Sequence, residues 1–179
     1  LDKLQQRAAT LFVRELRLQA ESRGLEFAPD ASMMAQSKDT AATEEALHLA
    51  KRKELSGLMS ILKLQKIQRE QDLTASQQAL ETSRNMLGLI KDEITIIDPL
   101  VRQNIMPETR LLELRRDEQR MSGEIQAGVA RVAIAQSAIL EVENEISNGL
   151  DSYKRRALEE LNTVVAELSE VNTLVPALQ

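Results

Sequence analysis

The C-terminal part of the chain carries the pattern that most restricts its fold, a heptad spacing sustained over five repeats. Steps of three and four residues relate Leu111, Leu114, Glu118, Met121, Ile125, Gly128, Val132, Ala135, Ile139, Val142 and Ile146. This spacing places one stripe of side chains along one side of a helix, so it is typical of helices that pair lengthwise. It predicts a long helix over about residues 107–174, with Pro176 ending it.

A second long helix is expected over about residues 43–98. Its distal half keeps the same kind of spacing at Leu73, Ser76, Leu80, Ser83, Leu87, Ile90, Ile94, Ile97 and Val101. Its start is expected near Thr40 or Thr43, and Thr43 is a suitable N-cap, because its hydroxyl can accept a hydrogen bond from a free backbone N–H of the first turn. Residues 65–72 are nearly all polar, so a bend or a change of packing partner is expected there.

Two prolines separate these helices in the sequence PLVRQNIMP, residues 99–107. Pro99 disfavours helical geometry at the residue before it, and Pro107 suits the first turn of a new helix. We therefore predict that the chain reverses over residues 99–107, called the tip below. The two long helices would then pair antiparallel along their apolar stripes.

A shorter helix is expected over about residues 1–23, where Leu1, Leu4, Ala8, Leu11, Glu15 and Leu18 follow the heptad spacing. Gly24 is the expected C-cap residue, and residues 24–42 are expected to form a loop. At 1.5 Å per residue the three helices measure roughly 35, 85 and 100 Å. Because the third helix is the longest, we expect the first helix to lie collinear with the second and to cover the part of the third helix that extends beyond the second. A three-helix bundle is the alternative.

The composition fits this thin architecture, because aromatic residues make up only 2% of the chain. The predicted fold class is all-α, a long antiparallel coiled-coil hairpin with a short extra N-terminal helix. Residues 1–179 are expected to form one helical domain, interpreted as a fragment of a larger protein because the chain starts at Leu1 without methionine. No apolar run approaches the length of a membrane span, so no direct membrane contact by this fragment is expected.

The residue types that catalysis and metal binding need are scarce. The chain has no cysteine, its six glycines are scattered, and its one histidine, His48, is expected at the surface. We therefore predict no enzyme activity and no catalytic, cofactor or metal site. The net charge of −5 gives no basis for nucleic-acid binding, which needs clustered Lys and Arg.

The tip is the candidate interaction site. Leu100, Val101, Ile105 and Met106 are four apolar residues at a turn that solvent should reach. Closing the end of a coiled coil accounts for one or two of them. The other apolar residues at the turn have no such role, so they predict a surface that docks onto helices of a partner.

The passage IIDPLVRQNIMPETRLLELRRDEQ between two long heptad helices resembles the hairpin tip of periplasmic adaptor (membrane fusion) proteins, most of all the HlyD-like adaptors of type I secretion. The resemblance implies a periplasmic protein anchored in the inner membrane of a Gram-negative bacterium and assembled with neighbouring protomers into a ring. It further implies a link between an ABC transporter and a TolC-like outer-membrane channel, with the tip docking on the channel.

The related drug-efflux adaptors carry an Arg, Leu, Ser, Asp pattern at the tip. Leu100 and Asp117 occupy the Leu and Asp places here, whereas Ile96 and Pro107 stand where Arg and Ser are expected. This favours the secretion branch, with an efflux adaptor or a structural coiled-coil spacer as alternatives. The residues expected to bind the partner are Leu100, Val101, Arg102, Asn104, Ile105, Met106, Pro107, Arg110 and Asp117.

Overall fold

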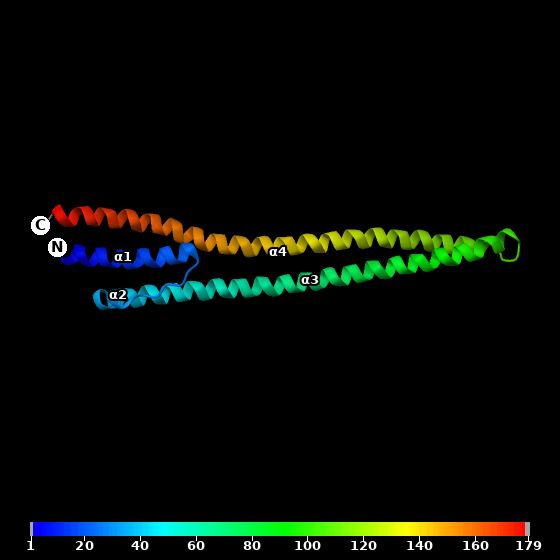
Figure 1. Ribbon diagram of the computed structural model, residues 1–179. Coiled ribbons are helices and arrows are strands. Elements are labelled where there is room, and N and C mark those ends of the chain that lie inside the picture. The colour runs from blue at the N-terminus through cyan, green and yellow to red at the C-terminus, as the bar shows by residue number, and fades with distance from the viewer. Residues whose placement is uncertain (1, 178–179) are drawn as a thin grey trace. The chain divides into compact units, whose positions relative to one another are not determined.

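The computed structural model describes residues 2–177, and these form four α-helices joined by short connections. They are α1 (Asp2–Arg23), α2 (Ala31–Gln36), α3 (Lys38–Arg102) and α4 (Glu108–Ala177) (Figure 1). The described residues contain no strand. The predicted all-α class and long helical hairpin are confirmed.

The helices contribute to two compact units. The base unit comprises Leu1–Lys63 and Asn144–Gln179, and the tip unit comprises Leu64–Glu143. Both α3 and α4 therefore pass through both units. The first boundary lies directly before the polar stretch 65–72, where the apolar stripe of α3 is weakest.

In the tip unit α3 and α4 run antiparallel. The Lys66 ammonium lies 2.8 Å from a Glu143 carboxylate oxygen, and Leu80 packs against Gly128. Residue numbers thus rise along α3 as they fall along α4, as an antiparallel pair requires. The stripe is the part of each helix that is buried, including Leu80, Ile97, Leu111, Leu114 and Val142.

In the base unit α1 packs on two neighbours. One face joins the C-terminal part of α4 in a core of Leu11, Leu18, Ala157, Val164 and Val171. A second core contains Val13 of α1, Phe27 of the connection and Ala41 of α3. The position of α1 beside both helices can be followed in Figure 1.

The expected collinear placement of the first helix is wrong in the base unit, although α1 does cover part of α4. Val13 packs near Ala41 and Arg17 is ion-paired with Glu44, so α1 lies beside the first turns of α3. The physical reason is a second apolar stripe on α1, at Val13, Leu16 and Ala20. A helix with two apolar stripes buries both only when it has two neighbours.

The start of α3 also differs from expectation. Ala41 donates its backbone N–H to the Ser37 carbonyl at 2.8 Å, so the helix begins at Lys38 with Ser37 at its N-cap position. The Thr43 hydroxyl instead donates to the Asp39 carbonyl within the helix. Ser37 and Thr43 are both good N-cap residue types, and the earlier one is used. The loop expected over 24–42 is shortened further by α2.

The helix ends follow local chemistry. Gly24 has a φ of 71° and Leu25 donates its N–H to the Ala20 carbonyl at 2.8 Å, which confirms Gly24 as the residue that ends α1. Pro99 does not stop α3, which continues to Arg102. A proline removes its own N–H bond to the carbonyl four residues earlier, and since α3 ends only three residues after Pro99, little of the helix follows the proline. The fourth helix likewise continues past residue 174 to Ala177.

Candidate functional site

The turn at the tip is built from a hydrogen-bonded helix end. Asn104 has a φ of 56° and donates its N–H to the Val101 carbonyl at 2.9 Å, while Ile105 donates to the Leu100 carbonyl at 2.9 Å. This is the bonding pattern of a helix ended by a left-handed residue, a conformation that asparagine tolerates better than most residues. The turn therefore has a defined backbone geometry.

The apolar residues of the tip differ in exposure. Ile105 is 64% exposed, whereas Leu100, Val101 and Met106 are partly buried. The three partly buried residues are available both to close the end of the helix pair and to contact a partner. Ile105 is therefore the most accessible of the four apolar side chains at the turn.

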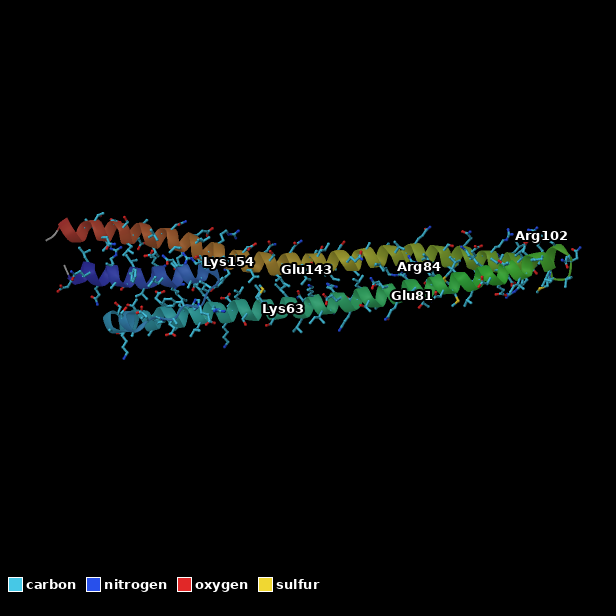
Figure 2. The ribbon with its side chains drawn as sticks, in the orientation of Figure 1. Lys63, Glu81, Arg84, Arg102, Glu143 and Lys154 are labelled. Carbon is cyan, nitrogen blue, oxygen red and sulfur yellow. The ribbon has the colours of Figure 1, made fainter. Side chains whose placement is uncertain are left out.

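Arg102 lies at the turn with its side chain 77% exposed (Figure 2). Its guanidinium lies 2.7 Å from an Asp98 carboxylate oxygen one helical turn earlier. The Arg102 end of this pair is exposed, and Arg115 also lies 3.8 Å from the partly buried Asp98, so Arg102 can exchange Asp98 for another acceptor at little cost.

Arg110 has a different role from Arg102. Its guanidinium donates to Glu93 of α3 and lies 3.4 Å from Glu113. The hydrogen bond from Arg110 to Glu93, followed by the attraction of that carboxylate, raises the Arg110 pKa. Arg110 therefore joins the two helices just behind the turn.

Asp117 is not brought to the turn. It lies on α4 about ten residues after Pro107, roughly 15 Å along the helix, and pairs with Arg120 at 3.0 Å. Pro107 lies next to the turn, and its carbonyl accepts the Arg110 N–H at 3.2 Å. The structure thus gathers eight of the nine predicted residues over and just behind the turn.

A second cluster of functional groups lies in the base unit, and the expectation of a surface His48 is wrong. His48, Arg17 and Glu21 are 1%, 0% and 1% exposed. The Nε2 atom of His48 accepts the Phe27 backbone N–H at 3.1 Å, and Nδ1 lies 3.3 Å from a Glu21 oxygen. The sequence signal that could have placed His48 inside is the continued heptad spacing through Ala41, Glu44, His48, Lys51 and Leu55.

Arg17 connects α1, α3 and α4 within the base unit. It donates to Glu21 of α1 at 2.8 Å, to Glu44 of α3, and to Glu160 of α4 at 3.3 Å. Burial alone would lower the Arg17 pKa, but hydrogen bonds to Glu21 and Glu44 and their negative charges outweigh it and raise the pKa. The buried charge is therefore fully compensated.

Glu160 collects three cations. Arg14 lies 2.6 Å away, Arg17 3.3 Å and Lys51 3.5 Å. Burial would raise the Glu160 pKa, but the hydrogen bond from Arg14 and the three positive charges lower it below its ordinary value. The charges of the cluster thus hold α4 against both other helices.

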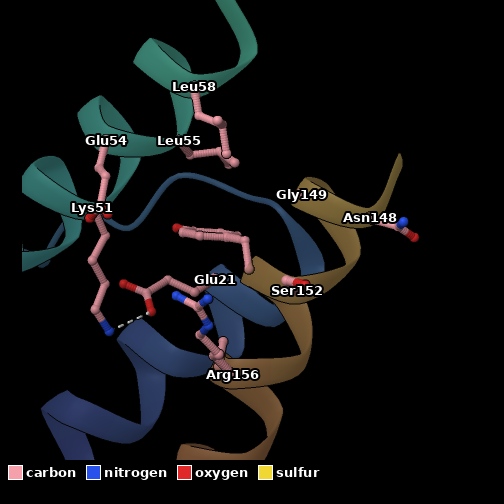
Figure 3. A pocket seen from close by; sticks show the side chains of 11 residues that line it. Glu21, Lys51, Glu54, Leu55, Leu58, Asn148, Gly149, Ser152 and Arg156 are labelled. Atoms are coloured by element: carbon pink, nitrogen blue, oxygen red, sulfur yellow. Dashed lines mark ion pairs between the residues drawn. The ribbon is translucent and has the colours of Figure 1, made fainter. Parts of the chain in front are cut away.

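A cavity of about 500 Å³ lies beside this cluster, lined by residues of α1, α3 and α4 that include Glu21, Lys51, Leu55 and Tyr153 (Figure 3). The Tyr153 hydroxyl is shielded from solvent and has no hydrogen-bond partner among the described residues. Burial and the Glu21 charge raise its pKa. Within the described part of the chain, no three His, Asp or Glu side chains are placed to hold a metal ion.

The fourth helix contains an apolar stretch, contrary to the expectation that no apolar run approaches the length of a membrane span. The segment Glu108–Leu174 is long and apolar enough to meet the length and composition criterion for a membrane span, with 11% of its most apolar window buried. One helix that meets this criterion is weak evidence for a membrane span.

Comparisons with known proteins agree with this geometry. Residues 1–179 match the model of a protein family described as AprE, long alpha-helical hairpin. The chain is 28% identical over 169 residues to the type I secretion system membrane fusion protein PrsE of Rhizobium meliloti strain 1021, a match covering 90% of this chain and 38% of PrsE.

A solved structure has the same fold. The soluble domain of LipC, a membrane fusion protein of a type I secretion system, superposes with a TM-score of 0.89 at 20% identity, covering 98% of this chain and 85% of the LipC chain. The resemblance to the helical hairpin of type I secretion adaptors is thereby confirmed.

Proposed function

This chain belongs to the AprE long α-helical hairpin family, and from that membership we propose that it is the helical domain of a type I secretion adaptor. The adaptor would link an inner-membrane ABC transporter to a TolC-like outer-membrane channel. The chain spans 38% of the length of PrsE, so the membrane anchor and remaining domains would belong to other parts of the parent protein. The hairpin would lie in the periplasm and have no enzymatic role.

The observation that carries this proposal is the exposed turn at the end of the antiparallel pair in the tip unit. Ile105 presents an apolar side chain to solvent on a backbone fixed by the hydrogen bonds of Asn104 and Ile105. A fixed turn with an exposed apolar side chain loses little conformational entropy when it docks. Partner helices of the channel could therefore bind it with modest contact area.

The predicted tip residues would contribute to docking in different ways. Leu100, Val101, Ile105 and Met106 would supply the apolar contact, and Arg102 and Asn104 would supply polar contacts around it. Pro107 and Arg110 would hold the turn in place. Asp117 lies too far along α4 to join the same contact and would serve only a partner that extends along the helix.

The outer faces of α3 and α4 would meet neighbouring protomers in a ring. Both helices expose large apolar side chains away from their shared stripe, among them Leu89 at 66% and Ile134 at 69%. Contact with neighbouring hairpins would cover such side chains, which in a lone hairpin face water.

Site-specific cross-linking in secreting cells tests the docking. This chain has no cysteine, so Asn104→Cys in an otherwise cysteine-free parent gives one thiol at the turn, and Ser137→Cys gives a matched thiol on an exposed part of α4. A thiol-linked photo-cross-linker should capture the channel from position 104 and not from position 137. Equal capture from both positions would contradict docking through the tip.

A second experiment separates the adaptor from a structural spacer. Replacing residues 99–107 by a neutral turn of equal length should stop secretion while the circular dichroism signal for helix is retained. Unchanged secretion would favour a spacer, because a spacer needs only the two helices and not the side chains of the turn.

A further inference from the structure

The buried His48 is the feature of the base unit that the proposed function does not use. We propose that His48 is a protonation-sensitive latch, which holds the connection between α1 and α2 only while its imidazole is neutral. This inference is independent of the secretion role, because it concerns the folding of the connection and no partner.

The hydrogen bonds of His48 define which nitrogen carries the proton. Nε2 accepts the backbone N–H of Phe27, so it has no hydrogen of its own in this arrangement. A neutral imidazole then carries its hydrogen on Nδ1, directed at the Glu21 carboxylate 3.3 Å away. Each ring nitrogen therefore has one defined role, acceptor for the connection and donor to α1.

Protonation of His48 removes the acceptor. Both nitrogens of an imidazolium are donors, so a hydrogen on Nε2 would face the Phe27 N–H across the present 3.1 Å separation. Two donors cannot share that geometry. The bond to Glu21 would strengthen at the same time, which keeps the ring in place and leaves Phe27 as the group that has to move.

The surrounding charges offer no carboxylate in excess for the added positive charge. The charged or titratable groups around His48 come from α1 (Arg14, Arg17, Glu21), the connection (Glu26), α3 (Glu44, Lys51, Arg52) and α4 (Tyr153, Glu160). Glu21, Glu44 and Glu160 are balanced by three cations, and Glu26 pairs with Arg52 at 3.0 Å. A protonated His48 therefore adds net positive charge to a neutralised cluster.

Release would be confined to the connection. Phe27 is 8% exposed, and its ring lies edge-on to His48 with centroids 6.1 Å apart. The core of Leu11, Leu18 and Val164 holds α1 on α4 without any contribution from Phe27. Losing the latch should therefore free residues 25–30 while α1 stays docked on α4.

Nuclear magnetic resonance tests the latch directly, because His48 is the only histidine in the chain. Imidazole nitrogen shifts of the 179-residue chain should show the Nδ1–H form above the His48 titration. As the pH falls, the Phe27 amide signal should shift with the same midpoint. Its hydrogen exchange, compared with that of the α1 amides, which stay docked on α4, should gain about fivefold, the factor for one net hydrogen bond. An Nε2–H form, or a Phe27 amide that ignores the titration, would overturn the proposal.

Two variants separate the latch from simple packing. In His48→Gln the carboxamide oxygen can accept the Phe27 N–H and does not titrate, so the Phe27 amide should stay protected from exchange at pH values both above and below the His48 titration. In His48→Phe the ring volume is kept without an acceptor, so Phe27 should exchange fast at both. Unchanged helicity and protected α1 amides show that each variant has folded.

The exposed Glu141→Gln change in the tip unit is the matched control and should leave the pH response as in the parent chain. If the response of Phe27 persists in His48→Gln, the latch does not reside in His48. If both variants lose α1 protection as well, His48 supports the whole base unit and the confined release is wrong.

Discussion

Gly128 of α4 lies directly against Leu80 of α3, so close that a β-carbon on Gly128 would come within 3.1 Å of Leu80 Cδ1. Gly123, one turn and a half earlier on the same helix, has open space at the equivalent point, with no heavy atom within 4 Å. The two glycines therefore offer a matched test of how tightly the helices of the tip unit pack.

Gly123→Ala should stabilise the chain by about 0.5–1 kcal/mol, because alanine loses less backbone entropy in a helix than glycine. Gly128→Ala should gain less, because the Leu80 side chain must shift to admit the methyl group. Gly128→Leu should destabilise, since its side chain cannot fit beside Leu80. Urea unfolding of the three variants followed by circular dichroism measures the order, and an equal gain in both alanine variants would show that the contact is loose.

The buried Arg17 should be among the most sensitive positions of the base unit. Arg17→Met leaves Glu21 and Glu44 without their main partner, and an unpaired buried carboxylate costs about 3 kcal/mol or more. Arg14→Met removes a guanidinium that is 40% exposed and should cost at most about 1 kcal/mol. Thermal unfolding of both variants gives the comparison, and similar losses would mean that Arg17 is hydrated in solution.

The ion pairs of Glu160 should make the stability of the base unit sensitive to acid. Its pKa is lowered in the folded chain, so its ion pairs stabilise fully above the unfolded value of 4.5, and this contribution is lost as the pH falls below that value. Glu160→Gln should lower the melting temperature at neutral pH and should differ little from the parent chain at pH values well below 4.5. A melting-temperature difference that does not shrink on acidification would contradict this assignment.

Asn104 predicts how the turn tolerates substitution. Asn104→Gly should be neutral or slightly stabilising, because glycine adopts the positive φ of 56° without strain. Asn104→Val should cost about 1–2 kcal/mol, since a β-branched residue is strained in that region. Comparing the unfolding free energies of the two variants measures the strain. Equal stabilities would indicate that the turn can adopt a different backbone conformation.

The helices and their reversal could be predicted because they depend on local signals. Heptad spacing identifies Leu111, Leu114 and Val142 as residues that face a neighbour, and all three are buried. The two prolines of the tip locate the reversal. The helix expected to end at residue 98 continues through Pro99 to Arg102, because a proline removes only its own N–H bond and the helix ends three residues later.

The arrangement of α1 and the buried cluster could not be predicted in the same way. The stripe predicted for the first helix leaves out Val13, and Ala41 falls in the expected loop 24–42, so the predicted spacing does not bring these two residues together as the second core does. His48, Arg17 and Glu21 tolerate burial because they form hydrogen bonds and ion pairs with one another across two helices. Their residue types alone predict exposure. The exposure of Ile105 relative to Met106 likewise depends on the path of the turn.

The contacts Lys66–Glu143 and Leu80–Gly128 between the two antiparallel helices restrict how a hairpin of this kind can change in length. A deletion in one helix shifts every later contact residue of that helix relative to the other helix. Only a deletion of equal length at the matching position of the other helix restores the pairing. Relatives with shorter or longer tip units should therefore differ by coupled insertions or losses of whole heptads in both helices.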